Sequence, residues 1–360
     1  MKLIIFSKDT KIFDKSSSVQ KRMLDLAGAF EQVHIIVLSS GRQKYLPELL
    51  PPNLFLYSGQ ASFYFFGYAT ALSIGLQIVK KIGKTGVVIT AQDPFEVGCI
   101  AYLVSKISRV KLQLQVHTDL GNFYFRKDLF KNRIRLLIAG YLLPRADKVR
   151  VVSSKIKDFL ISSFGVEEKN ITILPVWMDF GEYRSAPVKI DLRKLYPQFD
   201  EIILISSRLT REKNISLALL SFKKISEQRP MAGLIIVGDG PERLNLENQV
   251  KALGLEGRVV FRGWSDDLTS CYKTADLFVN TSWYEGFGRT LLEALVCGCP
   301  VVSTDVGIAK EAGVTIADFT PDDFAGKMIA VLSKPGPVLF PAKFNLTKEE
   351  YIKIFKTSLE

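Results

Sequence analysis

The stretch Leu277–Ala294, which reads LFVNTSWYEGFGRTLLEA, decides the fold of this chain. It opens with the apolar run Leu277–Asn280 and ends in a helical pattern that starts near Thr290, so a strand is followed by a turn and a helix. Gly286 and Gly288 let the intervening backbone turn tightly and approach a ligand closely. The free N–H groups at such a helix start attract anions. The stretch therefore predicts an α/β fold with an anion-binding turn.

Two carboxylates flank this turn, because Glu285 and Glu293 stand eight residues apart around it. Each can accept hydrogen bonds from a different part of one ligand, and the vicinal hydroxyls of sugars and riboses are donors of this kind. A capped surface helix with a Glu in its early turns is the alternative interpretation of the same pattern.

Strand and helix patterns alternate along the rest of the chain. Strands that are apolar on both faces and alternate with helices indicate parallel sheets covered on both sides. The expected strands are Leu3–Ser7, Val33–Ser39, Val87–Ala91, Leu112–His117, Val149–Ser153, Ile171–Leu174, Ile202–Ser206, Leu234–Val237, Val259–Arg262, Leu277–Asn280 and Val301–Ser303.

A polar stretch without sustained apolar periodicity interrupts this alternation. At 360 residues the chain is also long enough for two domains. In sheets of this kind, ligands bind beyond the carboxyl ends of the strands, so we expect a cleft between two domains. The expected division is a first domain over 1–180, a linker over 181–200, a second domain over 201–345, and a final helix within 346–360 that crosses back to the first domain.

A second group of polar residues opens the second domain. Arg208 leaves the end of a strand and Lys213 stands five residues further on, near the next helix start. Two cations at the carboxyl edge of a sheet suit a departing diphosphate, which needs its charge neutralised. Gly238 follows the next strand, in a turn that lacks the G-x-G-x-x-G spacing of a dinucleotide fingerprint.

Histidine is rare in this chain, and His34 and His117 are the two examples. His34 lies within an expected strand and is interpreted as structural. His117 ends a strand and is followed by Asp119, so we expect both at the ligand-binding edge of the first domain, although a structural histidine fits the position too.

The bulk composition narrows the classes of protein. The net charge is +11, and the segment 126–150 holds eight Lys or Arg against Asp128 and Asp147. Such a basic face suits phosphate-rich partners or an anionic membrane, and it also fits a merely solvated surface. The start of the chain reads as a strand and not as a signal peptide, and the apolar run Phe63–Val79 is too short and interrupted for a membrane span. We therefore expect a cytoplasmic protein.

Several catalytic patterns are missing from the sequence. No D-x-D pair suggests a metal-held diphosphate, and neither a P-loop Gly-Lys-Ser/Thr nor a G-x-S-x-G elbow occurs. Phosphotransfer and serine hydrolysis are therefore not expected, and no metal or cofactor is expected.

Taken together, these residues resemble the retaining glycosyltransferases of family 4, which have the GT-B fold of two Rossmann-like parallel-sheet domains facing a central cleft. The resemblance is strongest over 202–313, and its most specific element is the E-x7-E signature of Glu285 and Glu293. It implies that the first carboxylate lies by the donor sugar and that the second binds the ribose hydroxyls. The catalytic residues it implies are Glu285, Arg208, Lys213 and His117. The donor-binding residues it implies are Gly238, Gly286, Phe287, Gly288, Arg289, Thr290 and Glu293.

The chain departs from the family pattern in its first domain. The usual Gly-rich loop after the first strand is replaced by Asp14–Ser18, and the usual Asn-Gly after the last strand by Pro175–Asp179. The hydroxyls of Ser17 and Ser18, with Asp119, are the candidates for the acceptor side.

The resemblance implies transfer of a sugar, with retention, from a UDP- or GDP-linked donor to a glycan or a polyprenyl- or lipid-linked glycan. The basic helical segment Arg126–Leu143 repeats apolar residues on one side, so it fits peripheral contact with anionic lipid on the inner face of the plasma membrane. Ordinary packing within the domain is the alternative. A sugar-nucleotide epimerase of the same fold, a non-catalytic nucleotide-sugar binder and a nucleic-acid binder stay open, although no recognised nucleic-acid motif occurs and no nucleic-acid partner is expected.

Overall fold

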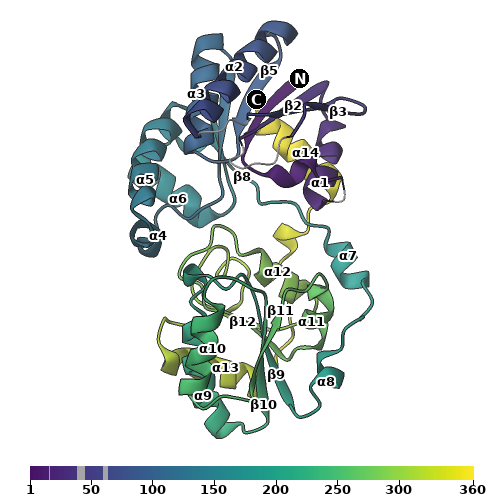
Figure 1. Cartoon of the computed structure of the whole chain (residues 1–360), viewed down its shortest axis with the longest axis vertical. Coiled ribbons are helices and arrows are strands. Elements are labelled where there is room, and N and C mark those ends of the chain that lie inside the picture. The colour runs from purple at the N-terminus through teal and green to yellow at the C-terminus, as the bar shows by residue number, and fades with distance from the viewer. Residues whose placement is uncertain (16, 39–44, 60–63) are drawn as a thin grey trace. The chain divides into compact units, whose positions relative to one another are not determined.

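The computed structural model describes residues 1–15, 17–38, 45–59 and 64–360. Within these residues the chain divides into two compact units (Figure 1). Unit 1 comprises Met1–Val176 and Lys348–Glu360, and unit 2 comprises Trp177–Thr347. Ser16, Ser39 and Phe63, which belong to stretches discussed above, lie outside the described residues.

The described part of unit 1 is built on an eight-stranded sheet with the order β3-β4-β2-β1-β5-β6-β7-β8. All neighbouring strands are parallel except β3 and β4, which are antiparallel. The strands are β1 (Lys2–Ser7), β2 (Gln32–Val37), β3 (Glu48–Leu50), β4 (Leu54–Ser58), β5 (Val87–Ala91), β6 (Lys111–Val116), β7 (Lys148–Val151) and β8 (Ile171–Ile173).

The helices of unit 1 include α2 (Tyr64–Ile82), whose Gly75 allows close packing on the sheet. A Cβ atom at Gly75 would lie 2.9 Å from Phe6 of β1 and 2.9 Å from Val104 of α3. Among the described residues, no helix combines the length and apolar character that a membrane crossing requires. The other described helices of unit 1 are α1 (Ser18–Ala27), α3 (Glu96–Ser108), α4 (Phe123–Asp128), α5 (Phe130–Leu142), α6 (Ser154–Phe164) and α14 (Lys348–Thr357). Three short 3-10 turns accompany them: η1 (Thr10–Phe13), η2 (Leu143–Arg145) and η3 (Glu168–Asn170).

Helix α14 belongs to unit 1 although it is separated from the rest of that unit by the whole of unit 2. Its Phe355 is buried and packs edge-on against Phe30. Gln113 of β6, fully buried, donates a hydrogen bond to the carbonyl of Ser358, and Arg150 of β7 donates to the Tyr351 hydroxyl at 2.8 Å.

Unit 2 has a six-stranded parallel sheet among its described residues, in the order β11-β10-β9-β12-β13-β14. The strands are β9 (Glu201–Ser206), β10 (Ala232–Val237), β11 (Val259–Gly263), β12 (Leu277–Asn280), β13 (Val301–Ser303) and β14 (Thr315–Ile316). The helices are α7 (Phe180–Ser185), α8 (Leu192–Leu195), α9 (Ile215–Gln228), α10 (Arg243–Ala252), α11 (Leu268–Thr274), α12 (Arg289–Val296) and α13 (Pro321–Ser333), with 3-10 turns η4 (Arg211–Lys213) and η5 (Ala342–Phe344).

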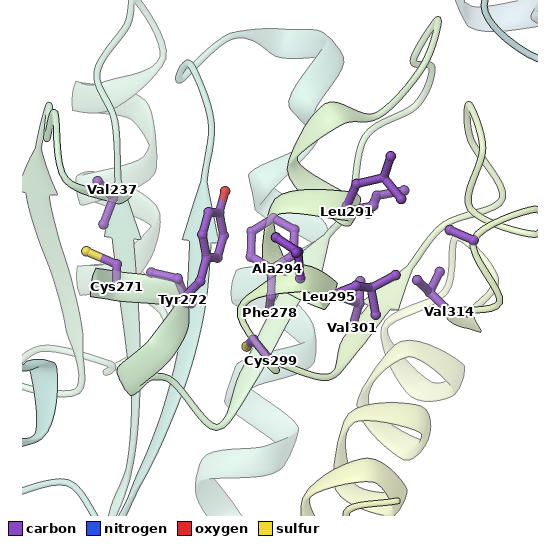
Figure 2. Packing of buried hydrophobic residues seen from close by; sticks show 14 of the residues in the cluster. Val237, Cys271, Tyr272, Phe278, Leu291, Ala294, Leu295, Cys299, Val301 and Val314 are labelled. Carbon is purple, nitrogen blue, oxygen red and sulfur yellow. The ribbon is translucent and has the colours of Figure 1, made fainter. Parts of the chain in front are cut away.

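Two apolar clusters cover the two faces of the unit 2 sheet. Along β9, Ile202 and Leu204 join one cluster while Ile203 and Ile205 join the other, as the two-residue period of a strand requires. The first cluster contains side chains of α11 and α12, and Figure 2 shows part of it, with Tyr272 and Phe278 side by side. The second contains side chains of α9, α10 and α13. The predicted α/β fold with two parallel-sheet, Rossmann-like domains is therefore confirmed.

The stretch 181–200, expected to be a linker, instead packs within unit 2. It carries α8 and most of α7, and its Leu192 and Phe199 are buried in the first apolar cluster, as is Phe180 just before it. Two well-spaced apolar side chains within the stretch, with Phe180 before it, anchor the stretch, and the polar residues around them conceal this pattern in the sequence. The expected basic helix over 126–143 also differs, because Leu129 adopts an extended backbone conformation that separates α4 from α5.

Candidate functional site in unit 2

The candidate site lies at β9 and β12, the neighbouring strands of the unit 2 sheet at which the strand order reverses. From β9 the chain proceeds to β10 and β11 on one side, and β12, β13 and β14 lie on the other. Helix α9, after β9, and helix α12, after β12, contribute to opposite apolar clusters, so the two connecting loops diverge. A divergence of this kind opens a crevice at the carboxyl edge of a parallel sheet, and ligands of such folds bind there.

A pocket of about 500 Å³ occupies this position. Its walls come from the ends of β9 and β12, the loops that follow them and the start of α12. The lining residues are Ile205, Ser206, Ser207, Arg208, Lys213, Phe278, Val279, Asn280, Thr281, Ser282, Glu285, Gly288, Arg289 and Thr290.

An ion pair between Lys213 and Glu285 crosses the pocket wall. The Lys213 Nζ lies 2.5 Å from Glu285 Oε1, and both side chains are largely withdrawn from solvent. Ser282 Oγ lies 2.9 Å from the same carboxylate oxygen. Because Lys213 follows β9 and Glu285 follows β12, this pair joins the two loops that the sequence predicted to carry the chemistry.

Hydrogen bonds to backbone carbonyls hold the two loops in place. The Thr281 hydroxyl donates to the carbonyl of Lys213 at 3.0 Å, and the N–H of Trp283 donates to the carbonyl of Glu212 at 2.8 Å. Asn214 ends the η4 turn with a left-handed backbone, at φ 47°, and begins α9. The position of Lys213 is therefore fixed by the fold and not by its side chain alone.

Arg208 provides a second cation on the pocket wall. Its side chain is 69 % exposed, and its only short contact with an acid among the described residues is to Glu212, at 3.5 Å. A long, poorly aligned pair at an exposed position contributes little to stability. The guanidinium is therefore able to engage an anionic ligand at small cost.

Two polar atoms of the pocket wall are buried without a hydrogen-bond partner among the described residues. They are Oγ of Ser207 and Nδ2 of Asn280. Buried polar atoms of proteins are nearly always hydrogen-bonded, to protein or to a bound molecule. Their position in this pocket points to a polar ligand.

The start of α12 forms the remaining wall. Gly288 is the N-cap residue, with φ 87°, and no side chain caps the helix there. The first N–H groups of a helix have no intrahelical acceptor and carry its positive dipole end. Gly288, Arg289 and Thr290 line the pocket, so this end contributes to an anion-binding surface.

Glu293 does not line the pocket but is held behind it. The residue is 6 % exposed, and Oε1 accepts hydrogen bonds from Arg289 Nε at 2.7 Å and from the Tyr183 hydroxyl at 3.0 Å. Oε2 lies 3.2 Å from the Tyr272 hydroxyl, which in turn lies 2.5 Å from Ser206 Oγ. A hydrogen-bonded chain thus runs from Arg289 through this carboxylate to the end of β9.

Tyr183 and Tyr272, the two tyrosines bonded to Glu293, stay protonated at neutral pH. Burial, together with the neighbouring Glu293 carboxylate, raises the pKa of Tyr183 to about 12. The same causes raise the pKa of the fully buried Tyr272 well above its usual value. Both hydroxyls therefore remain hydrogen-bond donors to the carboxylate.

Three other residues that the resemblance implied for donor binding lie outside the described pocket lining: Gly238, Gly286 and Phe287. Gly238 has φ 135°, and a Cβ atom there would lie 1.8 Å from the carbonyl oxygen of Ser207. Phe287 packs on the first apolar cluster and against Phe344. Gly238 thus supports the loop that carries Ser207 and Arg208.

In unit 1, His117 follows β6 directly, and its Nε2 lies 3.1 Å from Gln115 Oε1. Burial, with a contribution from Arg150, lowers the pKa of His117 to about 3. The imidazole is therefore neutral at physiological pH and suited to hydrogen bonding, not to supplying a proton.

The acceptor-side candidates of unit 1 have structural partners. Asp119 is buried, which raises its pKa, and its Oδ1 accepts from the N–H of Gly121 at 3.1 Å. Ser17 is the N-cap of α1, where its Oγ accepts from Gln20 and donates to the carbonyl of Lys11. Ser18 is the exposed first residue of that helix.

Sequence reasoning missed the residues that complete this site. Asn280 ends β12 and Ser282 follows shortly after it, and polar residues at the end of an apolar strand were a usable signal. Tyr183 and Tyr272 come from α7 and α11, and no local pattern connects them with Glu293.

Comparison with known proteins places this pocket in a recognised domain. Residues 192–345 match the family model described as glycosyl transferases group 1, and all of the pocket-lining residues lie within that range. The alpha-monoglucosyldiacylglycerol synthase of Streptococcus pneumoniae is 27 % identical over 253 residues, which cover 67 % of this chain and 55 % of the relative. The mannosylfructose-phosphate synthase of Agrobacterium fabrum is 34 % identical over 189 residues, which cover 49 % of this chain and 41 % of the relative. The chain thus spans about half the length of these curated relatives.

Among solved structures, Anabaena HepE in complex with UDP superposes with a TM-score of 0.73 at 19 % identity, covering 100 % of this chain and 96 % of that one. At this identity the likeness concerns the fold. The protein therefore has the two-domain α/β fold of GT-B glycosyltransferases, and its candidate site lies in the part that matches glycosyl transferases group 1.

Proposed function

We propose that this protein is a glycosyltransferase that moves a sugar from a nucleotide diphosphate sugar to an acceptor hydroxyl, with retention at the anomeric carbon and without a metal. One observation carries the proposal: a single pocket brings together Arg208, the Lys213–Glu285 pair and the start of α12. Two cations and a helix N-terminus suit a diphosphate, and carboxylate and amide groups suit the hydroxyls of a sugar.

The chemistry assigned to these residues is charge stabilisation of the leaving diphosphate. As the bond between the anomeric carbon and the diphosphate breaks, negative charge grows on the phosphate oxygens. Groups fixed in advance around that charge lower the barrier more than they stabilise the bound donor. Arg208 and Lys213 take this role, while Glu285, held by Lys213 and Ser282, accepts hydrogen bonds from the sugar.

Glu293 takes the ribose in this proposal. Oε1 already accepts hydrogen bonds from Arg289 and Tyr183, so a ribose hydroxyl that bonds to this oxygen replaces one of them. Arg289 is the half-exposed partner and lines the pocket, and its movement is the expected adjustment on donor binding.

For the acceptor we propose a glycan or a polyprenyl- or lipid-linked glycan, used at the inner face of the plasma membrane. The pneumococcal relative supports a lipid-linked acceptor, since its name, alpha-monoglucosyldiacylglycerol synthase, describes a glucosylated lipid. The neutral imidazole of His117 suits hydrogen bonding to hydroxyls.

Thermal unfolding with a panel of nucleotides tests the donor site. A ligand at a hundred times its Kd adds about 2.7 kcal/mol to the free energy of unfolding. We expect UDP or GDP, and the matching sugar conjugates, to raise the Tm, and we expect Glu293→Ala to lose most of that shift. NAD and CMP should have no effect, and an unchanged Tm with every nucleotide overturns the proposal.

The nucleotide sugar that gives the largest shift is then incubated with candidate acceptors, and the product is examined by NMR. An α-linked product from an α-linked donor supports retention. Conversion of the donor to an epimer without an acceptor would reassign the protein as a sugar-nucleotide epimerase.

A further inference from the structure

Helix α5 carries a row of large apolar side chains that its own unit does not cover. Phe130, Ile134, Leu137 and Tyr141 are 75, 49, 76 and 54 % exposed. Their spacing of four, three and four residues places them on one face of the helix. We call these four residues the α5 stripe.

The preceding residues add to this apolar surface. Phe123 of α4 is 59 % exposed and Leu129, between the two helices, is 45 % exposed. The opposite side of α5 makes the ordinary contacts with unit 1, because Asn132, Ala139 and Leu142 are buried. The apolar residues at the exposed face are therefore not needed for the core of unit 1.

Basic side chains lie before, within and after the segment that carries the stripe. Between 120 and 146 the chain has Arg126, Lys127, Lys131, Arg133, Arg135 and Arg145 against a single acid, Asp128. Arg135 faces inward and pairs with Glu96. The other five are exposed and lie close to the stripe along the chain, and we call these five residues the basic ring.

Two of these cations lie directly over exposed aromatic rings. The Lys127 Nζ is 4.4 Å from the centre of the Phe123 ring, and the Arg145 guanidinium is 4.0 Å from that of Tyr141. An aromatic ring beside a long basic side chain suits the boundary between the acyl chains and the anionic headgroups of a bilayer. The ring enters the acyl region, and the charged group stays among the headgroups.

We propose that the α5 stripe and its basic ring form a docking surface for an anionic lipid bilayer. The apolar row inserts between the headgroups, and the cations contact their phosphates. This surface goes beyond the proposed donor chemistry, since it lies in unit 1 and needs no nucleotide.

Charge separates this occupant from the alternatives. A second copy of the chain in a two-fold contact would place the same positive ring against itself, which is repulsive. A nucleic acid would use the cations but would leave Phe130 and Leu137 against polar phosphates and sugars. An anionic bilayer satisfies the apolar and the basic residues together.

Vesicle co-sedimentation of the full chain, without nucleotide sugar, tests the proposal. The two probes are vesicles of phosphatidylcholine alone and vesicles in which part of it is replaced by phosphatidylglycerol. The wild-type chain should bind the anionic vesicles preferentially, and added salt should weaken the binding. Leu137→Glu should lower the partition by roughly tenfold or more, since it removes an inserted side chain. Lys127→Glu should lower it by roughly fivefold for each charge unit lost.

The matched control is Leu244→Glu in α10, because Leu244 is 67 % exposed on a helix of unit 2. It should bind vesicles as the wild type does. Equal binding of wild type and Leu137→Glu, or no preference for anionic lipid, overturns the proposal. Self-association in sedimentation velocity that Leu137→Glu abolishes would assign the surface to a second copy instead. Since no nucleotide is present, each of these failures leaves the donor-site proposal intact.

Discussion

At the scale of single residues, Arg208 and Lys213 differ in how the fold holds them. Lys213 is enclosed by Glu285 and by the two tied loops, whereas Arg208 is largely exposed with one long contact. The enclosed cation fixes the geometry of the pocket, and the exposed one is the easier to test without damaging the fold.

Arg208→Ala should lower kcat by about 10²–10³-fold, because a positive charge that stabilises the leaving diphosphate is then lost. KM for the donor should change much less, and the Tm should stay within a degree or two. The comparison variant is Arg211→Ala, an exposed cation of the same loop outside the described pocket lining. If both variants turn over equally, Arg208 has no special role.

Tyr272→Phe should lower the free energy of unfolding by about 1–3 kcal/mol, since Ser206 Oγ and Glu293 Oε2 then lose a buried partner. Denaturant unfolding measures the change. The ring keeps its packing against Phe278, so a loss much greater than this would mean that the hydroxyl is not the cause. Donor affinity should fall too, because the carboxylate loses one of its supports.

At the scale of elements, the turn after β10 supports the loop after β9. A Cβ atom at Gly238 would meet the Ser207 carbonyl, and one at Gly240 would lie 2.4 Å from the carbonyl oxygen of Leu209. Backbone approaches backbone here, and no side chain is available to move aside. The shape of the pocket wall therefore depends on residues that do not touch its interior.

Gly238→Ala should destabilise the protein by several kcal/mol and weaken donor binding, because its backbone conformation and the contact with Ser207 both exclude a methyl group. The contrasting variant is Gly326→Ala in α13, where nothing lies within 4 Å of a new Cβ atom. That change should stabilise by up to about 1 kcal/mol. Thermal unfolding of both variants gives the comparison, and equal effects would contradict the contact argument.

The sequence predicted the strands that are buried on both faces, because continuous apolar runs such as Ile202–Ser206 have no other good interpretation. It missed β3, β4 and β14, which are short strands that are not buried along their whole length. Arg208, Lys213 and Glu285 were predicted together for a topological reason: each follows a strand at the carboxyl edge. The hydrogen-bonded partners of Glu293 were not predictable, because α7 and α11 reach it only in the folded unit.

At the scale of the whole molecule, two titrating histidines connect pH with stability. Burial, with Lys81 and Lys2 nearby, lowers the pKa of His34 to about 4 from its usual 6.5. Between these values the unfolded chain binds more protons than the folded one, so stability rises with pH in this window and falls as pH drops toward 4. The lowered pKa of His117 also makes the folded protein less stable as the pH falls.

His34→Gln should remove this part of the pH dependence. The difference in the free energy of unfolding between wild type and variant should change by up to about 3 kcal/mol from pH 7 to pH 4, in the direction that penalises the wild type at acid pH. Denaturant unfolding at a series of pH values measures it. If the free energy of unfolding changes with pH in the same way in both proteins, the pKa of His34 is not lowered in the folded protein.

Removal of residues 348–360 should destabilise unit 1 and spare unit 2. The deletion uncovers the site of Phe355 and leaves the buried Gln113 and Arg150 without Ser358 and Tyr351. We expect the calorimetric transition of unit 1 to fall by more than about 10 °C. A fragment of residues 177–347 identifies the unit 2 transition, which should not move. Loss of both transitions together would mean that the two units do not unfold separately.

The return of α14 to unit 1 also sets an order for folding during protein synthesis. Residues 177–347 are contiguous, so unit 2 has its full sequence as soon as Thr347 leaves the ribosome. Unit 1, although synthesised first, must wait for residues 348–360 before Gln113 finds its partner. The half made first is therefore the half finished last, and in the interval its incomplete core is the part of the nascent chain that a chaperone would bind.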